Sequence, residues 1–249
     1  MSDFNQYILV GLVAFMASVL GGCAGYGTGL LLPPALVSII GAEAVVPVIS
    51  LSALLTNASR LLAFWSDFDR WKAGLVILSA APSCLLAAYG YTLLSGPGVT
   101  ILIGAMLILL VPLRVNLIRK RGHLPLRALP VAAAGYGLLT GGTSGSGVIL
   151  ISILLSAGLS GSAVIATDAG ISLVLGIAKV IVFQTAGALP FFLWAMALTI
   201  GVCSIPGAFL AKRLTLRLPE KKHILILDGT VILGGVLLLV QGVRAFWNS

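Results

Sequence analysis

Long apolar runs separated by short polar stretches dominate the chain. The runs cover residues 7–40, 43–65, 73–94, 99–118, 126–157, 162–186, 191–210 and 224–243. Most of them are about 20 residues long, which is the length of helix that crosses the hydrocarbon core of a bilayer. None alternates apolar and polar residues in the short segments that a membrane β-barrel needs. The pattern therefore predicts an all-α integral membrane protein.

Two of these runs are too long for one crossing and too short for two, and each is interrupted by glycines in its middle. The interruptions read GGCAGYGTG at 21–29 and TGGTSGSG at 140–147. Because a glycine inside a helix costs about 1 kcal/mol relative to alanine, an unbroken helix is unfavourable there. Paired glycine breaks in the two halves of a membrane protein are typical of a transporter's binding site, where irregular backbone lines a cavity. We therefore expect two re-entrant helix pairs whose turns form the substrate site.

The second half of the chain repeats the pattern of the first. When the halves are displaced by 119 residues, Lys179 falls on Arg60, and the second glycine break falls on the first at a displacement of 118. The repeat predicts two transmembrane units, residues 1–118 and 126–249, joined by a basic cytoplasmic linker at 119–125. Each unit is expected to hold one glycine-broken helix pair followed by three transmembrane helices.

Composition and charge set the expected orientation. The chain is 59% hydrophobic and only 9% charged, with a net charge of +8. Basic residues gather around Arg70, in the linker and at 212–222, and cytoplasmic loops of membrane proteins are rich in such residues. These three loops share one face only if each broken run returns to the side it entered, which inverts the second unit relative to the first. Both termini would then lie outside; a plain bundle of eight crossings is the alternative.

Arg60 and Lys179 are the first candidates for substrate binding. A charged group at mid-membrane costs about 2.5–3.5 kcal/mol on insertion scales, so it normally faces a cavity or a partner. In an inverted repeat, equivalent residues approach the pseudo-twofold axis from opposite sides, which would place one cation on each flank of a central site. The alternative is that each long side chain extends its head to the nearer membrane surface.

The glycine breaks supply further candidates. A half-helix that begins near Gly29 or Gly147 points its free N–H groups and the positive end of its dipole toward mid-membrane, where they favour an anion. The candidate binding residues are Gly27, Thr28, Gly29, Ser144, Gly145, Ser146 and Gly147, with Asn57 as a further hydrogen-bonding residue. Tight helix packing is the alternative explanation for glycines in membrane segments.

Asp168 is the one acidic residue well placed within a predicted spanning segment. It could carry a coupling proton, or pair with Lys179 or Arg60. Its position near the end of a predicted helix also allows it simply to lie at the membrane interface.

The stretches GGCAGYGTGLLLPPALVSIIGAEAVVPVISLSALLTNASRLLAFW at 21–65 and GGTSGSGVILISILLSAGLSGSAVIATDAGISLVLGIAKVIVFQTAGALP at 141–190 resemble the sulfite exporter TauE/SafE family of membrane permeases. The resemblance covers essentially the whole chain. It implies transport of a sulfur-containing anion such as sulfite, thiosulfate or an organosulfonate like sulfoacetate, usually out of bacterial cells. The expected location is the bacterial inner membrane.

The residues by themselves point to a secondary transporter of a small oxoanion. An anion channel and a non-transporting membrane scaffold are the alternatives. No nucleophile–base pair, no cofactor or ATP-binding motif and no metal-ligand spacing is present in the sequence, so we expect no enzyme activity, cofactor or metal. In a membrane chain the positive charge reports orientation rather than nucleic-acid binding. A homodimer is compatible with the sequence.

Overall fold

The computed structural model describes residues 3–23, 28–119, 124–215 and 220–247. Within these ranges the protein is entirely helical, which confirms the predicted all-α class. The helices are α1 (Asp3–Cys23), α2 (Leu32–Ile40), α3 (Ala42–Ala63), α4 (Arg70–Thr92), α5 (Pro97–Arg119), α6 (Leu129–Gly142), α7 (Gly147–Ser156), α8 (Ser162–Thr185), α9 (Phe191–Thr215) and α10 (Glu220–Trp247). Two short 3-10 helices, Thr28–Leu30 and Trp65–Asp67, complete the described structure.

The helices have the length and surface of a membrane protein. α3, α4 and α8 are each long and apolar enough to cross a bilayer, and shorter apolar stretches occur in α1, α5, α7, α9 and α10. Large apolar side chains cover the outside, for example Leu78 on α4, which is 78% exposed, and Val131 on α6, which is 75% exposed. Soluble monomers rarely expose contiguous apolar surface on this scale.

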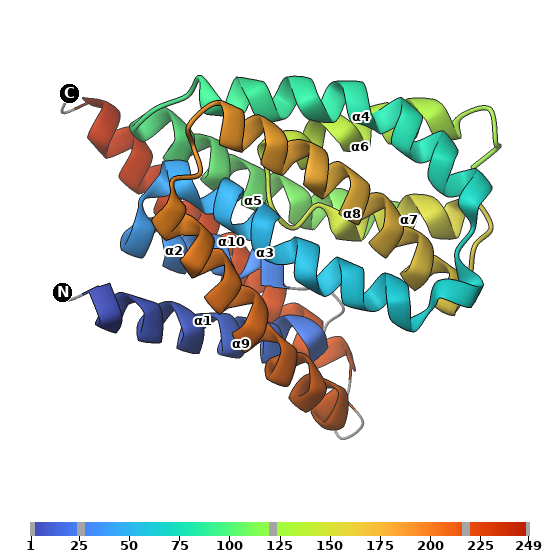
Figure 1. Ribbon diagram of the computed structural model, residues 1–249, viewed down its shortest axis with the longest axis horizontal. Helices are drawn as coiled ribbons and strands as arrows, with labels where there is room; N and C mark the ends of the chain where they lie inside the picture. The colour runs from blue at the N-terminus through green and yellow to red at the C-terminus, as the bar shows by residue number, and fades with distance from the viewer. Residues whose placement is uncertain (1–2, 24–27, 120–123, 216–219, 248–249) are drawn as a thin grey trace.

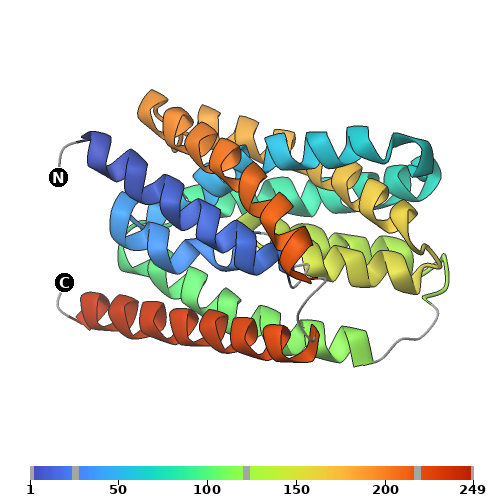
Figure 2. The same ribbon diagram turned by 90° about the horizontal axis from the view of Figure 1, so that it is seen from below.

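The two broken runs fold back on themselves. α1 extends from the N-terminal end of the molecule and α2 returns toward the same end, whereas α6 and α7 form a similar pair at the opposite end (Figure 1, Figure 2). The remaining helices run along the length of the molecule, and the two termini lie at one end of it (Figure 2). In the described parts of the two breaks, Leu30 and Thr143 are buried.

Helix packing places α3 and α8 at the centre. These two helices contact each other, and half or more of their apolar windows is buried, 50% for α3 and 56% for α8, against 28% for α4. Around them α1 packs on α9, α4 on α6 and α5 on α10. Gly137 and Gly141 let α6 approach the backbone of α4 at Ala80 and Cys84, which is the tight packing that small residues permit in membranes.

Local sequence explains where several helices begin. Pro33 and Pro34 lie in the first turn of α2, where a missing N–H leaves no hydrogen bond unmade. Gly41 separates α2 from α3 with a φ of 81°, a conformation that favours glycine. Asp69 caps α4, because its side chain accepts a hydrogen bond from the Lys72 N–H at 3.0 Å.

Candidate functional site

The two glycine breaks meet in the middle of the protein. The Ser144 hydroxyl donates a hydrogen bond to the Gly29 carbonyl at 2.9 Å. A Cβ on Gly29 would lie 2.7 Å from the backbone nitrogen of Gly145, so only glycine fits there. Gly145 itself has a φ of 83°, which also favours glycine. Gly27 and the side chain of Thr28 lie outside the described residues.

A cavity of about 170 Å³ opens beside this contact. Sites for drug-sized ligands have volumes of about 300–1,000 Å³, so this cavity has the size for a small ion. Its lining includes nine of the residues selected from the sequence, namely Gly29, Asn57, Arg60, Ser144, Gly145, Ser146, Gly147, Asp168 and Lys179. The structure thus brings residues from both predicted units to one place.

Arg60 does not face the cavity as an unpaired cation. Its Nη2 lies 3.0 Å from Oδ2 of Asp168, so α3 and α8 are joined by an ion pair. Asp168 is only 2% exposed, and of the partners considered for it, Arg60 is the one with which it pairs. The Arg60 side chain is 40% exposed, so the pair lies at the edge of the interior.

The second oxygen of Asp168 has a different environment. Oδ1 is buried and has no hydrogen-bond partner within the described part of the chain. It lies 4.0 Å from the position that a Cβ would take on Gly147, the first residue of α7. The carboxylate therefore lies between the guanidinium of Arg60 and the start of a helix.

Lys179 binds the end of a helix. Its Nζ donates to the carbonyl oxygens of Thr140 at 2.6 Å and Thr143 at 3.3 Å, at the C-terminus of α6. A cation is favourable there because the last carbonyls of a helix lack intrahelical partners and carry the negative end of its dipole. Lys179 is 6% exposed, so its side chain does not extend to the membrane surface. An ammonium group has three donors, and these two bonds leave one.

The two half-helices differ as anion sites. α7 begins at Gly147, and no side chain caps its first turn, so its N-terminus offers backbone donors and a positive dipole end to the cavity. α2 begins at Leu32 with Pro33 and Pro34, which have no N–H to donate. The first turn of α2 therefore has fewer backbone donors than that of α7, and α7 is the helix end better suited to an anion.

Several polar lining residues escaped the sequence analysis. They are Ser50 and Thr56 on α3, Tyr136 on α6, and Ser172 on α8. Helical spacing could have identified two of them from the sequence, because Thr56 precedes Arg60 by one turn and Ser172 follows Asp168 by one turn. Side chains four apart lie on one face of a helix, so each known candidate indicates its neighbours. Among the described residues, no three metal-ligating side chains form a cluster.

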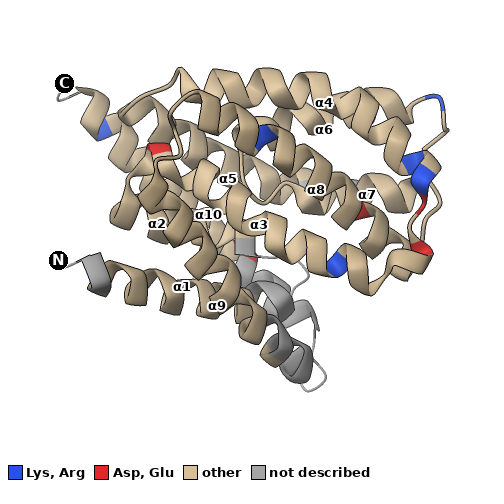
Figure 3. Cartoon of the chain, viewed as in Figure 1, with Lys and Arg blue, Asp and Glu red and all other residues tan. Residues whose placement is uncertain are grey.

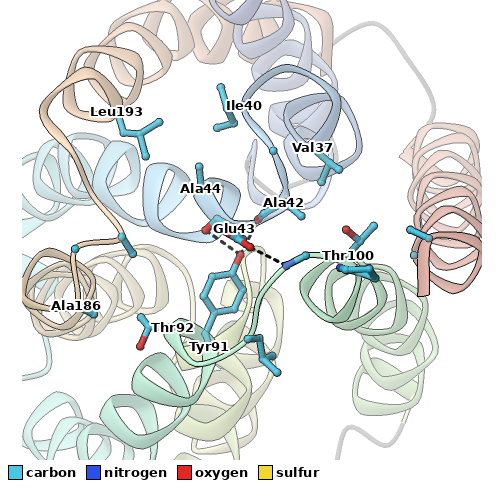
Figure 4. Close-up of a pocket in the computed structure, with 18 of the residues that line it drawn as sticks. Val37, Ile40, Ala42, Glu43, Ala44, Tyr91, Thr92, Thr100, Ala186 and Leu193 are labelled. Atoms are coloured by element: carbon cyan, nitrogen blue, oxygen red, sulfur yellow. Dashed lines mark hydrogen bonds between the residues drawn. The ribbon is translucent and has the colours of Figure 1, made fainter. Parts of the chain in front are cut away.

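A second and larger cavity of about 830 Å³ lies at the end of the molecule where α2 meets α3 (Figure 4). Glu43 and Tyr91 are among its lining residues, with parts of the α4–α5 and α8–α9 connections. Oε1 of Glu43 accepts a hydrogen bond from the Gly96 N–H at 2.7 Å, and the Tyr91 hydroxyl donates to the Ala42 carbonyl at 2.8 Å. The sequence analysis did not anticipate this cavity.

Buried apolar side chains separate the two cavities. Along α3, Val46 and Val48 lie between the residues that line the larger cavity and those that line the central one; along α8, Phe183 has the same position. All three are at most 1% exposed. The Phe183 ring also packs edge-on against Tyr91, with ring centroids 5.8 Å apart. Buried apolar side chains thus lie along α3 and α8 between the residues of the two cavities.

Comparison with known proteins gives one match. The family model described as "Sulfite exporter TauE/SafE" matches residues 10–238. No match was found among curated proteins or among solved structures.

Proposed function

Because the chain belongs to the sulfite exporter TauE/SafE family, we propose that it is a secondary transporter of a small sulfur-containing anion. Sulfite, thiosulfate and organosulfonates such as sulfoacetate are the substrates that fit the proposal, and export from the cell is the direction that the family description gives. One observation carries the proposal. Arg60, Lys179 and the N-terminus of α7 converge on a single small cavity inside an apolar helical protein.

The charges of this cavity support an anionic substrate. Its lining contains two cations, Arg60 and Lys179, and one carboxylate, Asp168, which leaves a formal excess of one positive charge. The start of α7 adds a positive partial charge, and the hydroxyls of Ser144 and Ser146 add hydrogen-bond donors. A tetrahedral or pyramidal oxoanion needs several donors at short range, and this set can supply them.

A repeat of two equivalent units is supported by the contacts between helices. If α1–α5 form one unit and α6–α10 the other, α1 corresponds to α6, α2 to α7, and so on. The contact between α1 and α9 then corresponds to the contact between α6 and α4. The contacts of α3 with α8 and of α5 with α10 each join corresponding helices of the two units. We propose that residues 1–118 and 126–249 are the two units, joined by 119–125. The substrate would reach either side of the membrane as these units move around the central cavity.

Re-entrant pairs are supported by helix length. α2 has nine residues and α7 has ten, which correspond to about 15 Å, or half of the hydrocarbon core. Described Lys and Arg residues gather at the end of the molecule opposite the termini (Figure 3), as expected for a cytoplasmic face. The larger cavity would then be an outer vestibule, closed from the site by Val46, Val48 and Phe183.

This topology predicts that both termini lie outside the cell. Epitope tags at the N- and C-termini should bind antibody on intact spheroplasts, and a tag inserted at 119–125 should bind only after the membrane is permeabilised. The linker tag is the matched control for membrane integrity. An N-terminal tag that is protected until permeabilisation would contradict the re-entrant arrangement.

The proposed function can be tested by ligand stabilisation of the purified protein. Its melting temperature would be measured against sulfite, thiosulfate, sulfate, sulfoacetate, taurine and chloride, because a ligand at a hundredfold excess over its Kd stabilises the folded state by about 2.7 kcal/mol. We expect a shift with at least one sulfur anion. Lys179→Met should lose it, and Lys72→Met, at the start of α4, should keep it.

If none of the anions shifts the melting temperature, the result would count against the proposal.

Measuring the flux of the anion into proteoliposomes distinguishes a transporter from a channel. A transporter shows saturation with substrate and faster exchange when the same anion is present inside, whereas a channel shows neither.

A further inference from the structure

The carboxylate of Asp168 occupies the place where the site would hold an external anion. Its Oδ2 lies 3.0 Å from the Arg60 guanidinium, and its Oδ1 lies next to the start of α7 at Gly147. These are two of the three positively charged features of the cavity; the third, Lys179, already donates to two carbonyl oxygens at the end of α6. A carboxylate and a sulfur oxoanion offer similar oxygen acceptors, so both would use the same donors.

A bound oxoanion and the Asp168 carboxylate would be close neighbours in this cavity. Its volume is about 170 Å³, so a bound oxoanion would lie within a few ångströms of Asp168. Two like charges at that distance repel strongly in a medium of low polarity. Oδ1 is already buried without a hydrogen-bond partner within the described residues, and such an oxygen is stabilised when it takes up a proton or gains a donor.

We propose that Asp168 and the transported anion compete for Arg60, so that the anion binds when Asp168 has accepted a proton. This inference rests on the proposed transport function. The proton comes from water and attaches to the carboxylate, which becomes neutral and releases the guanidinium. Arg60 then pairs with the anion, and one proton and one anion occupy the cavity together. When both leave, the Arg60–Asp168 pair re-forms in the empty site.

The consequence for transport is that the proton and the anion cross the membrane together, in the same direction. An outward gradient of the anion would carry protons out, and an inward proton gradient would draw the anion in. The empty carrier returns with Asp168 ionised and paired with Arg60.

The other titratable side chains that line the cavity with Asp168 are not carboxylates. Arg60 faces it from α3, Tyr136 lines the same cavity from α6, and Lys179 lines it from α8. α7 has no titratable residue. At the start of α4, the Asp69 N–H donates to the neighbouring Thr167 hydroxyl at 3.2 Å, while the Asp69 carboxylate is paired with Lys72. Asp168 is therefore the one acid among the residues that line the cavity.

The test is the pH dependence of thiosulfate affinity, measured on the purified full-length protein by calorimetry. Thiosulfate keeps its charge over the pH range of the experiment, so a change of Kd with pH reports on the protein. Where Asp168 is ionised in the free protein, Kd should rise about tenfold for each pH unit, because each bound anion brings one proton. Asp168→Asn should bind thiosulfate with a Kd that does not change with pH. Asp67→Asn, which removes an exposed acid, should keep the wild-type dependence.

Proton uptake gives a second readout that needs no variant. Binding enthalpies in two buffers of different ionisation enthalpy should report close to one proton taken up per thiosulfate bound. No uptake, or a pH dependence that persists in Asp168→Asn, would overturn the competition while leaving anion transport intact. Failure of wild-type protein to bind any of the sulfur anions at any pH would overturn the proposed function and this inference together.

Discussion

Replacing Arg60 with alanine is expected to abolish anion binding and to lower the melting temperature. A second substitution, Asp168→Asn, is expected to restore the melting temperature without restoring binding. Removing one partner of a buried ion pair costs about 3–5 kcal/mol because the remaining charge stays buried. Since the Arg60 side chain is 40% exposed, we expect the loss of folding stability in Arg60→Ala to be near the lower end of this range. The neutral amide of the double variant removes the buried charge but supplies no cation.

The measurement combines thermal unfolding with thiosulfate binding for both single variants and the double variant. We expect at least a hundredfold weaker binding in Arg60→Ala and in the double variant, and partial retention in Arg60→Lys, which keeps the charge but loses the planar donor fork. Arg70→Ala, at the start of α4 and away from the central cavity, is the control for loss of one positive charge. Wild-type affinity in Arg60→Ala would show that this guanidinium does not contact the substrate.

Gly29→Ala is expected to disrupt the centre of the protein. The added Cβ would lie 2.7 Å from the nitrogen and 2.9 Å from the Cα of Gly145. Both are backbone atoms, so no side-chain rotation relieves the clash, and the two breaks would have to separate. We expect a loss of more than about 3 kcal/mol, seen as a lower melting temperature or as aggregation on size-exclusion chromatography.

Gly74 and Gly90 on α4 supply the matched controls. A Cβ at either position meets open space, and alanine favours a helix over glycine by about 0.5–1 kcal/mol. Gly74→Ala and Gly90→Ala should therefore be as stable as the wild type or slightly more so. Equal stability of Gly29→Ala and Gly74→Ala would mean that the two breaks do not touch.

The candidate site was well anticipated where the signal was local. A charged residue inside an apolar run is visible in the sequence because its desolvation must be compensated somewhere, and this singled out Arg60, Lys179 and Asp168. A glycine cluster inside a helix is visible because it weakens the helix, and this singled out Gly29, Gly145 and Gly147. All six line the central cavity.

The partners of these residues could not be predicted in the same way. The repeat suggested that Arg60 and Lys179 have equivalent surroundings, yet one pairs with a carboxylate and the other with the carbonyl oxygens of α6. Asp168 has no acidic counterpart in the first half, where Ile49 stands at the corresponding position. Arg60 and Lys179 therefore have different partners because of single residues, such as Asp168, that differ between two halves of low sequence identity.

The sequence by itself determined the helical membrane class, the two interrupted segments and the identity of the charged residues inside them. These follow from hydropathy and backbone propensity, which are properties of short stretches. The tertiary structure decided which charges meet. Arg60 and Asp168 are 108 residues apart, and their interaction depends on a distance that only the packing of α3 against α8 fixes. The same packing set the size of the central cavity, because that size depends on how side chains from separate helices fill the space between them.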